Sequence, residues 1–322
     1  MRVAVASRSF SKHPVLRAEL SARFPQVTFN DAGASLSGRA LIDFLKDHDA
    51  AVTALERIDD ALLTALPRLR VIGKYGVGLD MIDFAALRRH GVRLGWTGGV
   101  NRRSVAELVI AFAIALLRHV PKGNAEIKAG TWRQLIGRQL SDRTVGIVGC
   151  GHVGKELAVL LGAFGCRLLA HDIRDFPDFH AAHGIEAVGL ERLLGEADVV
   201  SLHLPLDATT RDILSADRLA LMRPDAILIN AARGGLVDEA ALKAMLKEGR
   251  LAGAAFDVFQ TEPPDDAELI GLPNFLCTPH VGGSAEEAVL AMGRAAIAGL
   301  TDNAVPEPGS EVWRAAGLDS TL

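Results

Sequence analysis

The sequence contains little of what stabilises disulfide-rich or zinc-binding proteins. Only three of its 322 residues are cysteine, and Cys150, Cys166 and Cys277 are scattered without a C-x-x-C spacing. This excludes a disulfide framework and argues against a zinc site. We therefore expect no metal, and the free thiols fit a reducing compartment such as the cytoplasm.

Long hydrophobic runs are also missing. The apolar start at residues 1–7 is too short for a signal peptide. The most apolar stretch, residues 105–117, contains Glu107 and is shorter than the roughly 20 residues of a membrane span. We expect this stretch to be a buried helix, and we expect no membrane partner and a cytoplasmic location.

No strong excess of charge of either sign is present. The 35 Lys and Arg against 39 Asp and Glu leave a net charge of −4, and no basic run stands out. This argues against a nucleic-acid partner. The hydrophobic share of 49% is that of an ordinary globular protein.

Short β-type runs alternate with helical patterns along the whole chain, which predicts an α/β fold with parallel sheets. We expect strands at 3–6, 51–55, 69–74 and 92–96, and later at 144–149, 167–172, 199–203, 226–230, 252–258 and 275–278. Helical patterns at 13–24, 81–90, 101–120 and 284–300 accompany them. Because the β-α rhythm occurs twice, we expect two doubly wound domains.

The domain boundary is expected at the glycine-rich turn 97–100. A substrate domain, flavodoxin-like, would comprise residues 1–99 and 285–322. A Rossmann-type cofactor domain, residues 100–284, would be inserted into it, with the active site in the cleft. The polar tail from residue 301 would be short and either packed or frayed.

The strongest local motif is Gly149-x-Gly151-x-x-Gly154, which follows a β run and precedes a helical pattern. In that context it predicts a dinucleotide site. Gly149 would permit a tight turn and Gly151 a close approach of the backbone to the pyrophosphate. Gly154 would let the helix pack close to the strand, so that the helix N-terminus faces the phosphate charge. The alternative is a packing turn without a ligand. Asp172, 23 residues after Gly149, suits the ribose hydroxyls and favours NAD, whereas Arg174 leaves NADP open.

Several longer motifs follow one another along the chain: Lys74–Asp80, Leu202–Pro205, Met222–Asp238, Phe256–Pro263 and Thr278–Gly283. Together they resemble the D-isomer-specific 2-hydroxyacid dehydrogenases, such as the D-3-phosphoglycerate and glyoxylate/hydroxypyruvate enzymes. No part resembles their C-terminal regulatory domain.

The resemblance implies that Arg233, Glu262 and His280 are catalytic. Histidine titrates near neutral pH and suits proton donation to a carbonyl oxygen. A neighbouring glutamate orients the ring and stabilises its charged form, and arginine holds a carboxylate. Each residue taken alone has a structural explanation: a strand-end histidine, a turn glutamate, or a surface ion pair.

The resemblance also implies the binding residues. The substrate would be held by Tyr75, Gly76, Val77 and Gly78 together with Arg233 and His280, although Tyr75 could instead pack under its loop. The cofactor-binding residues implied are Gly149, Gly151, His152, Val153, Gly154, Asp172, Arg174, Leu204, Pro205, Thr210, Ala231, Ala232, Asp257, Gly282 and Gly283. Val77 would also lie near the cofactor.

The expected activity is hydride transfer between NAD(P)H and C2 of a small 2-oxo acid or D-2-hydroxy acid. A 2-imino acid reductase that forms D-amino acids uses the same geometry and remains an alternative. So does a dinucleotide-sensing protein similar to the corepressors that resemble this family. The apolar helix 101–120 and the following arm predict a homodimer.

Overall fold

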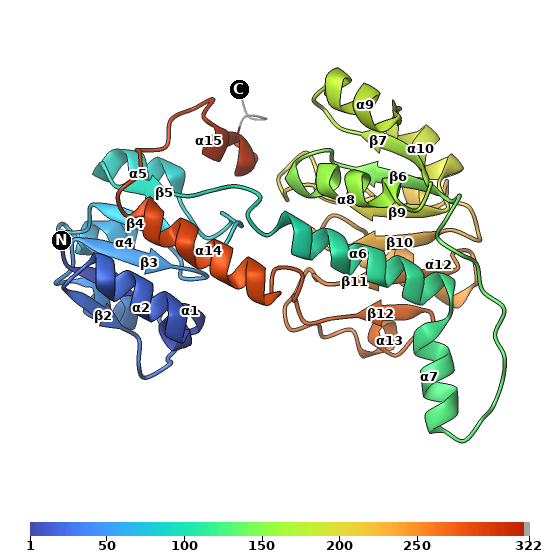
Figure 1. The fold of residues 1–322 in the computed structure, drawn as a ribbon, viewed down its shortest axis with the longest axis horizontal. Coiled ribbons are helices and arrows are strands. Elements are labelled where there is room, and N and C mark those ends of the chain that lie inside the picture. The colour runs from blue at the N-terminus through green and yellow to red at the C-terminus, as the bar shows by residue number, and fades with distance from the viewer. Residues whose placement is uncertain (319–322) are drawn as a thin grey trace. The chain divides into compact units, whose positions relative to one another are not determined.

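The computed structural model describes residues 1–318, and the chain divides into two compact units. One unit comprises residues 1–101 and the segment from Glu286 onward, and the other comprises residues 102–285 (Figure 1). Each unit is built on its own parallel sheet. The predicted α/β class with two doubly wound sheets is therefore confirmed.

The first unit contains a five-stranded sheet in which every neighbouring pair is parallel. Its order is β2 (Val27–Phe29), β1 (Val3–Val5), β3 (Ala50–Thr53), β4 (Val71–Lys74) and β5 (Arg93–Gly95). The order 2-1-3-4-5 is that of flavodoxin-like folds. β2 was not expected from the sequence, because this three-residue edge strand is only partly buried and has no continuous apolar run.

Helices cover both faces of this sheet and enclose two hydrophobic cores. One face carries α1 (Arg8–Lys12), α2 (Pro14–Arg23) and α14 (Glu286–Gly299); the other carries α3 (Gly38–Leu45), α4 (Asp60–Ala65) and α5 (Phe84–His90). The C-terminal tail also packs here through α15 (Glu311–Ala315), since Trp313 meets Phe84 edge-to-face at 5.7 Å. The last four residues of the expected tail lie outside the described residues.

The second unit contains a seven-stranded parallel sheet. Its order is β12 (Phe275–Cys277), β11 (Gly253–Phe256), β10 (Ile227–Asn230), β9 (Val199–Leu202), β6 (Thr144–Val148), β7 (Arg167–His171) and β8 (Ile185–Ala187). Counted from β6, this is the Rossmann order 3-2-1-4-5-6 with one added strand. The strand order reverses between β6 and β9, and ligands bind at such switch points. The short strand β8 was not expected from the sequence.

Two cores lie on the two faces of this sheet. One face is covered by α6 (Arg102–Leu117), α8 (His152–Gly162) and α9 (Pro177–His183). The other is covered by α10 (Leu190–Glu196), α11 (Ala216–Leu219), α12 (Glu239–Lys247) and α13 (Ala267–Ile270). The strands are buried on both faces, which explains why they read as continuous apolar runs.

The helix expected over 101–120 ends three residues earlier, at Leu117, and a second helix begins at Val120. The chain leaves α6 after Leu117 and continues in α7 (Val120–Lys128) at an angle of 62°. Between them His119 has a φ of 54°, a left-handed conformation that ends the regular helix. Among residues 1–318 no single helix is long and apolar enough to cross a membrane; α6 and α7 reach that length and composition only as a bent pair.

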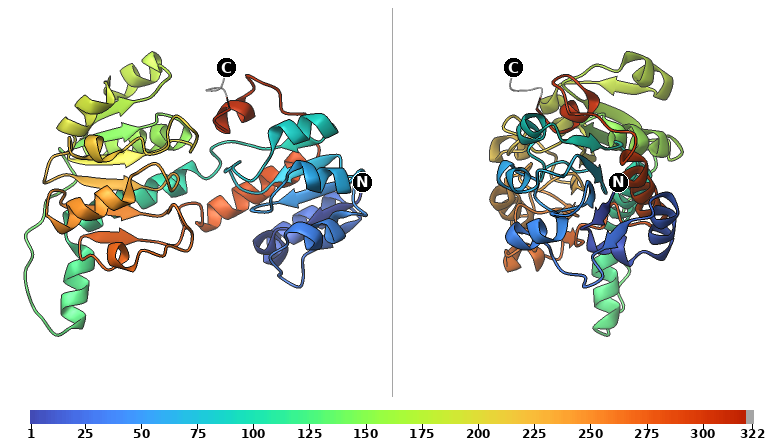
Figure 2. Two further views of the ribbon diagram at one scale, coloured as in Figure 1. Left: turned by 180° about the vertical axis from the view of Figure 1, so that it is seen from behind. Right: turned by 90° about the vertical axis from the view of Figure 1, so that its left-hand side faces the viewer.

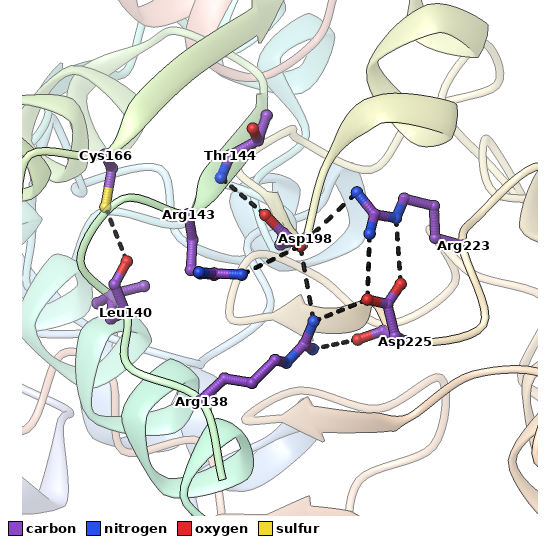
Figure 3. Close-up of polar contacts among 8 residues, drawn as sticks. All are labelled: Arg138, Leu140, Arg143, Thr144, Cys166, Asp198, Arg223 and Asp225. Carbon is purple, nitrogen blue, oxygen red and sulfur yellow. Dashed lines mark hydrogen bonds and ion pairs between the residues drawn. The ribbon is translucent and has the colours of Figure 1, made fainter.

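An arm, defined here as residues 118–141, projects from the seven-stranded sheet (Figures 1 and 2). It comprises α7 and an extended segment that returns to β6. Its return is held by a charge cluster at the amino ends of the strands (Figure 3). There Asp198 accepts the Thr144 N–H at 2.9 Å and lies within 4.0 Å of the guanidinium groups of Arg138, Arg143 and Arg223.

Candidate active site

The glycine motif forms the turn between β6 and α8. Gly149 has a φ of 97°, and a Cβ there would lie 2.6 Å from the carbonyl oxygen of His203. A Cβ at Gly154 would lie 2.1 Å from the carbonyl oxygen of Gly149. Both positions therefore require glycine. Gly151 is the N-cap of α8, and His152 and Val153 form its first turn, as a phosphate-binding helix start requires.

Asp172 directly follows β7, and its carboxylate contacts the glycine turn. Its Oδ2 accepts the Cys150 N–H at 2.7 Å, and its Oδ1 accepts the Arg174 N–H at 2.8 Å. The Arg174 guanidinium lies beside the Phe176 ring, 5.2 Å from its centroid, and 3.9 Å from where a Cβ of Gly151 would lie. A carboxylate and a guanidinium thus flank the same turn. Burial raises the pKa of the Cys150 thiol to about 11, so this cysteine stays neutral.

The loop after β9 carries Leu204, Pro205 and Thr210. The Thr210 hydroxyl donates to the carbonyl oxygen of Pro205 at 2.8 Å and accepts the Asp207 N–H at 2.8 Å, which closes a compact turn. His203 precedes this loop, and its Nε2 lies 2.9 Å from the Ser201 hydroxyl. Burial lowers the pKa of His203 to about 3, so its ring is neutral at physiological pH.

Arg233 lies in the loop after β10. The Asn230 amide donates to the Arg233 carbonyl oxygen at 2.8 Å and its Oδ1 accepts the Ala232 N–H at 3.1 Å, which fixes the backbone of Ala231 to Arg233. The Arg233 guanidinium donates to the Ala232 carbonyl oxygen at 2.6 Å. The guanidinium is therefore presented at the carboxyl end of the sheet by a hydrogen-bonded loop.

Glu262 and His280 form an ion pair. The Glu262 Oε2 lies 2.9 Å from the His280 Nδ1, and its Oε1 accepts the Phe259 N–H at 3.1 Å. About half of the His280 side chain is exposed, so its ring is accessible to a small molecule. With Glu262 ionised, Nδ1 donates to the carboxylate and the other ring nitrogen, Nε2, can carry the exchangeable proton.

Asp257 directly follows β11 and is only 1% exposed. Its carboxylate accepts the Thr278 hydroxyl at 2.5 Å, the Val281 N–H at 2.7 Å and the Gly282 N–H at 2.7 Å. The neighbouring strands β10, β11 and β12 are parallel, so Arg233, Asp257 and His280 lie at the same edge of the sheet. Asp257 thus fixes the loop that presents His280. Gly283 lies in the following turn.

The substrate loop implied by the resemblance lies at the carboxyl end of β4 in the first unit. Gly76 has a φ of 109°, and the Val77 carbonyl oxygen accepts from the Trp96 indole at 3.0 Å. The Tyr75 ring is buried edge-to-face against Phe10 with centroids 5.4 Å apart. Tyr75 therefore packs against α1, through Phe10. Gly78 completes the loop before a turn.

Two residues close to the segments that carry Arg233 and Glu262 were not identified from the sequence. Gly234 abuts the 259–260 peptide, because a Cβ there would lie 1.9 Å from the Phe259 carbonyl oxygen. Glu239 accepts the Gln260 N–H at 3.0 Å. The Gly-Gly pair after Arg233 could have indicated that another backbone segment comes close. The hydrogen bond of Glu239 to a residue 21 positions away could not be predicted from any local pattern. Within residues 1–318 no group of three or more His, Cys, Asp or Glu side chains is arranged to hold a metal ion.

Comparison with known proteins agrees with this geometry. Residues 110–282 match the model of the D-isomer specific 2-hydroxyacid dehydrogenase NAD-binding domain, which confirms NAD as the expected cofactor. The chain is 38% identical over 262 residues to the glyoxylate reductase of Pyrococcus furiosus, covering 78% of each. It is 36% identical over 267 residues to the D-3-phosphoglycerate dehydrogenase of Methanocaldococcus jannaschii.

That second match covers 82% of this chain but only 51% of the relative, so the chain spans about half the length of such dehydrogenases. Among solved structures, an acyclic imino acid reductase in complex with NADPH and D-Arg superposes with a TM-score of 0.83 at 25% identity. The alignment covers 92% of this chain and 95% of that one. Motifs, sheet order and relatives agree, and the chain belongs to the D-isomer specific 2-hydroxyacid dehydrogenase family.

Proposed function

We propose that this protein transfers a hydride between a nicotinamide dinucleotide and C2 of a small 2-oxo acid or D-2-hydroxy acid. The observation that carries the proposal is the Glu262–His280 pair, at 2.9 Å, on the sheet edge that also presents Arg233. An oriented imidazole and a guanidinium are what reduction of a carbonyl beside a carboxylate requires.

The residues around the glycine turn fit the cofactor. Gly149 and Gly151 let a pyrophosphate approach the N-terminus of α8, and the Asp172 carboxylate retains lone pairs for ribose hydroxyls. When bound, the nicotinamide ring supplies or accepts the hydride. Leu204, Pro205, Thr210, Ala231, Ala232, Gly282 and Gly283, with His152 and Val153, would complete its contacts.

The chain's own groups then manage charge and proton. Arg233 binds the substrate carboxylate and polarises the C2 carbonyl, and His280 delivers its Nε2 proton to the carbonyl oxygen as C2 accepts the hydride. Glu262 keeps the ring in this orientation and stabilises the imidazolium that precedes transfer. In the oxidative direction the neutral ring removes the hydroxyl proton. By the family resemblance, the substrate contacts would also include Tyr75, Gly76, Val77 and Gly78.

The direct test is a panel of 2-oxo acids, from glyoxylate to branched and aromatic side chains, each with NADH and with NADPH. We expect turnover of at least one member and a preference for NADH set by Asp172. Members with a carbon side chain at C2 should give a D-configured product, whereas glycolate, the product from glyoxylate, is achiral. Arg174 keeps NADPH as a possible second cofactor. Purified protein that binds NADH but reduces no member would contradict the proposal.

A 2-imino acid reductase is the second candidate, and the structural similarity to the acyclic imino acid reductase favours it. The same proton donor can serve a C=N bond, and the product would be a D-amino acid. Repeating the panel with ammonia separates the two, because an imine reductase requires the amine and yields a substrate for D-amino acid oxidase. A dinucleotide-sensing corepressor-like protein would bind NADH without turnover in either assay.

We further propose a cytoplasmic homodimer whose partners are small acids, not nucleic acid or membrane. The arm exposes apolar side chains suited to a second copy of the chain, and three unpaired cysteines fit a reducing compartment. Cell fractionation tests the location, and sedimentation tests the dimer.

We also propose that residues 1–99 with 285–322 form the substrate domain and that residues 100–284 form the cofactor domain.

A further inference from the structure

The loop that presents Glu262 is held from behind by a residue outside the catalytic set. Glu239 is the first residue of α12, whose N-cap Asp238 accepts the Ala241 N–H at 2.9 Å. From this fixed position its Oε1 accepts the backbone N–H of Gln260 at 3.0 Å. The hydrogen bond joins the start of a rigid helix to the middle of an otherwise irregular segment.

The neighbouring peptide carries the contact on to the ion pair. The Phe259 N–H donates to Oε1 of Glu262 at 3.1 Å, and Oε2 of the same carboxylate holds the His280 Nδ1 at 2.9 Å. Gly234 abuts the same peptide, since a Cβ there would lie 1.9 Å from the Phe259 carbonyl oxygen. The 259–260 peptide is therefore contacted both by the loop of Arg233 and by the side chain of Glu239.

We propose that Glu239 is a positioning residue that keeps Glu262 directed at His280 through the Gln260 and Phe259 peptides. The inference rests on the proposed function, since it names a further residue for the same proton transfer.

The surroundings of Glu239 disfavour its charge, so its role rests on the hydrogen bond that it accepts. It lines a cavity of about 210 Å³ together with Asp265 and Asp266, and Lys243 pairs with Asp266 at 2.7 Å. Burial raises the pKa of Glu239, and the nearby Asp266 and Asp265 raise it further against the hydrogen bond from Gln260. A strong acceptor kept partly out of water gains from a backbone donor.

Three substitutions separate the hydrogen bond from the charge. Glu239→Ala removes the acceptor, Glu239→Gln keeps an acceptor oxygen without the charge, and Glu248→Ala removes an exposed carboxylate at the other end of α12 as a control. We expect Glu239→Ala to lower kcat for reduction about three- to tenfold, the loss expected for one hydrogen bond, with little change in KM for NADH. In this variant the alkaline limb of the pH profile of reduction, where the rate falls as His280 loses its proton, should move to lower pH by roughly half a unit. Glu239→Gln should restore most of both.

The pH midpoint of the His280 ring proton signal, followed by NMR in the cofactor-free protein, gives a readout independent of activity. We expect it to move with the alkaline limb in Glu239→Ala and not in Glu248→Ala. An unmoved midpoint in folded Glu239→Ala, or a Glu239→Gln variant as impaired as Glu239→Ala, overturns the inference. If Glu239→Ala does not fold, Glu239→Asp, whose acceptor is one methylene shorter, is compared with Glu239→Gln on the same midpoint. Wild type without turnover contradicts the proposed function instead.

Discussion

His280 combines an accessible imidazole with a backbone conformation that most residues avoid. Its φ is 53°, and its N–H donates to the Asp257 carbonyl oxygen at 2.9 Å. Such a conformation costs about 1–3 kcal/mol and persists where the surroundings hold it, often at functional sites. Here the buried Asp257 supplies that hold by accepting three further hydrogen bonds from the same loop. The strain thus sets the direction of the ring.

Replacing Glu262 with Gln tests the ion pair at the residue scale. The carboxylate favours the protonated ring, so its removal should move the alkaline limb of the reduction profile to lower pH by about one unit. The measurement is kcat/KM for reduction between pH 5 and 9. Glu248→Gln, an exposed carboxylate after α12, serves as the control. An unmoved limb in Glu262→Gln would count against the pair.

His203 predicts a pH dependence of stability. Its pKa is about 3 in the folded protein against an ordinary value of 6.5. Between these values the unfolded chain binds the extra proton, so the free energy of unfolding falls as the pH drops from 6.5 towards 3, by up to about 1.4 kcal/mol per unit from this group.

Urea unfolding of wild type and His203→Gln at pH 7, 6 and 5 measures this contribution. We expect the variant to lose less stability on acidification than wild type, because glutamine does not titrate. Parallel pH dependences for the two proteins would show that His203 takes up its proton without cost to the fold.

At the scale of elements, the β6–α8 turn depends on an approach that only glycine permits. Gly154→Ala would place a methyl group 2.1 Å from a backbone oxygen that belongs to the same turn. We expect a loss of stability of about 2 kcal/mol and weaker NADH binding, because the start of α8 must move away from the strand. Urea unfolding and NADH fluorescence titration give the two values.

Gly162→Ala is the matched control on the same helix. No atom lies within 4 Å of its added Cβ, so alanine should be neutral or stabilising by up to about 1 kcal/mol. Equal losses in the two variants would mean that the close approach at Gly154 is not the cause of its loss of stability.

At the scale of the whole molecule, the arm exposes four large apolar side chains. Trp132 and Ile136 are 83% and 94% exposed, and Val120 and Ile127 are more than half exposed. The Asp198 cluster and the Cys166 thiol, which donates to the Leu140 carbonyl oxygen at 3.4 Å, anchor the return of the arm (Figure 3). An anchored apolar surface is suited to a second copy of the chain.

Replacing both Trp132 and Ile136 with Asp should therefore convert the proposed dimer to a monomer. Large aromatic side chains dominate interface energies, so we expect the dissociation constant to rise at least about a hundredfold. Sedimentation velocity across a concentration series measures the dissociation constant. Leu221→Asp, at an exposed leucine outside the arm, is the control. A wild-type monomer at every concentration would end the dimer proposal.

Much of this fold follows from local patterns. The two sets of buried parallel strands appear as continuous apolar runs, the glycine motif marks the first βα turn of the cofactor unit, and the family motifs mark Arg233, Glu262 and His280. The edge strands β2 and β8 were missed because three residues with mixed burial leave no apolar run. The break at His119 was missed because an apolar residue, Val120, follows it directly.

What the sequence by itself determined was the class of fold, the cofactor turn and the candidate catalytic residues, since each depends on residues close together in the chain. Only the tertiary structure decided how these residues are held. Asp257 accepts a hydrogen bond from the His280 loop 25 residues away, and Glu239 accepts one from Gln260 21 residues away. Tyr75 packs against Phe10. Such contacts depend on which strands become neighbours, and strand order is set by the packing of the whole sheet.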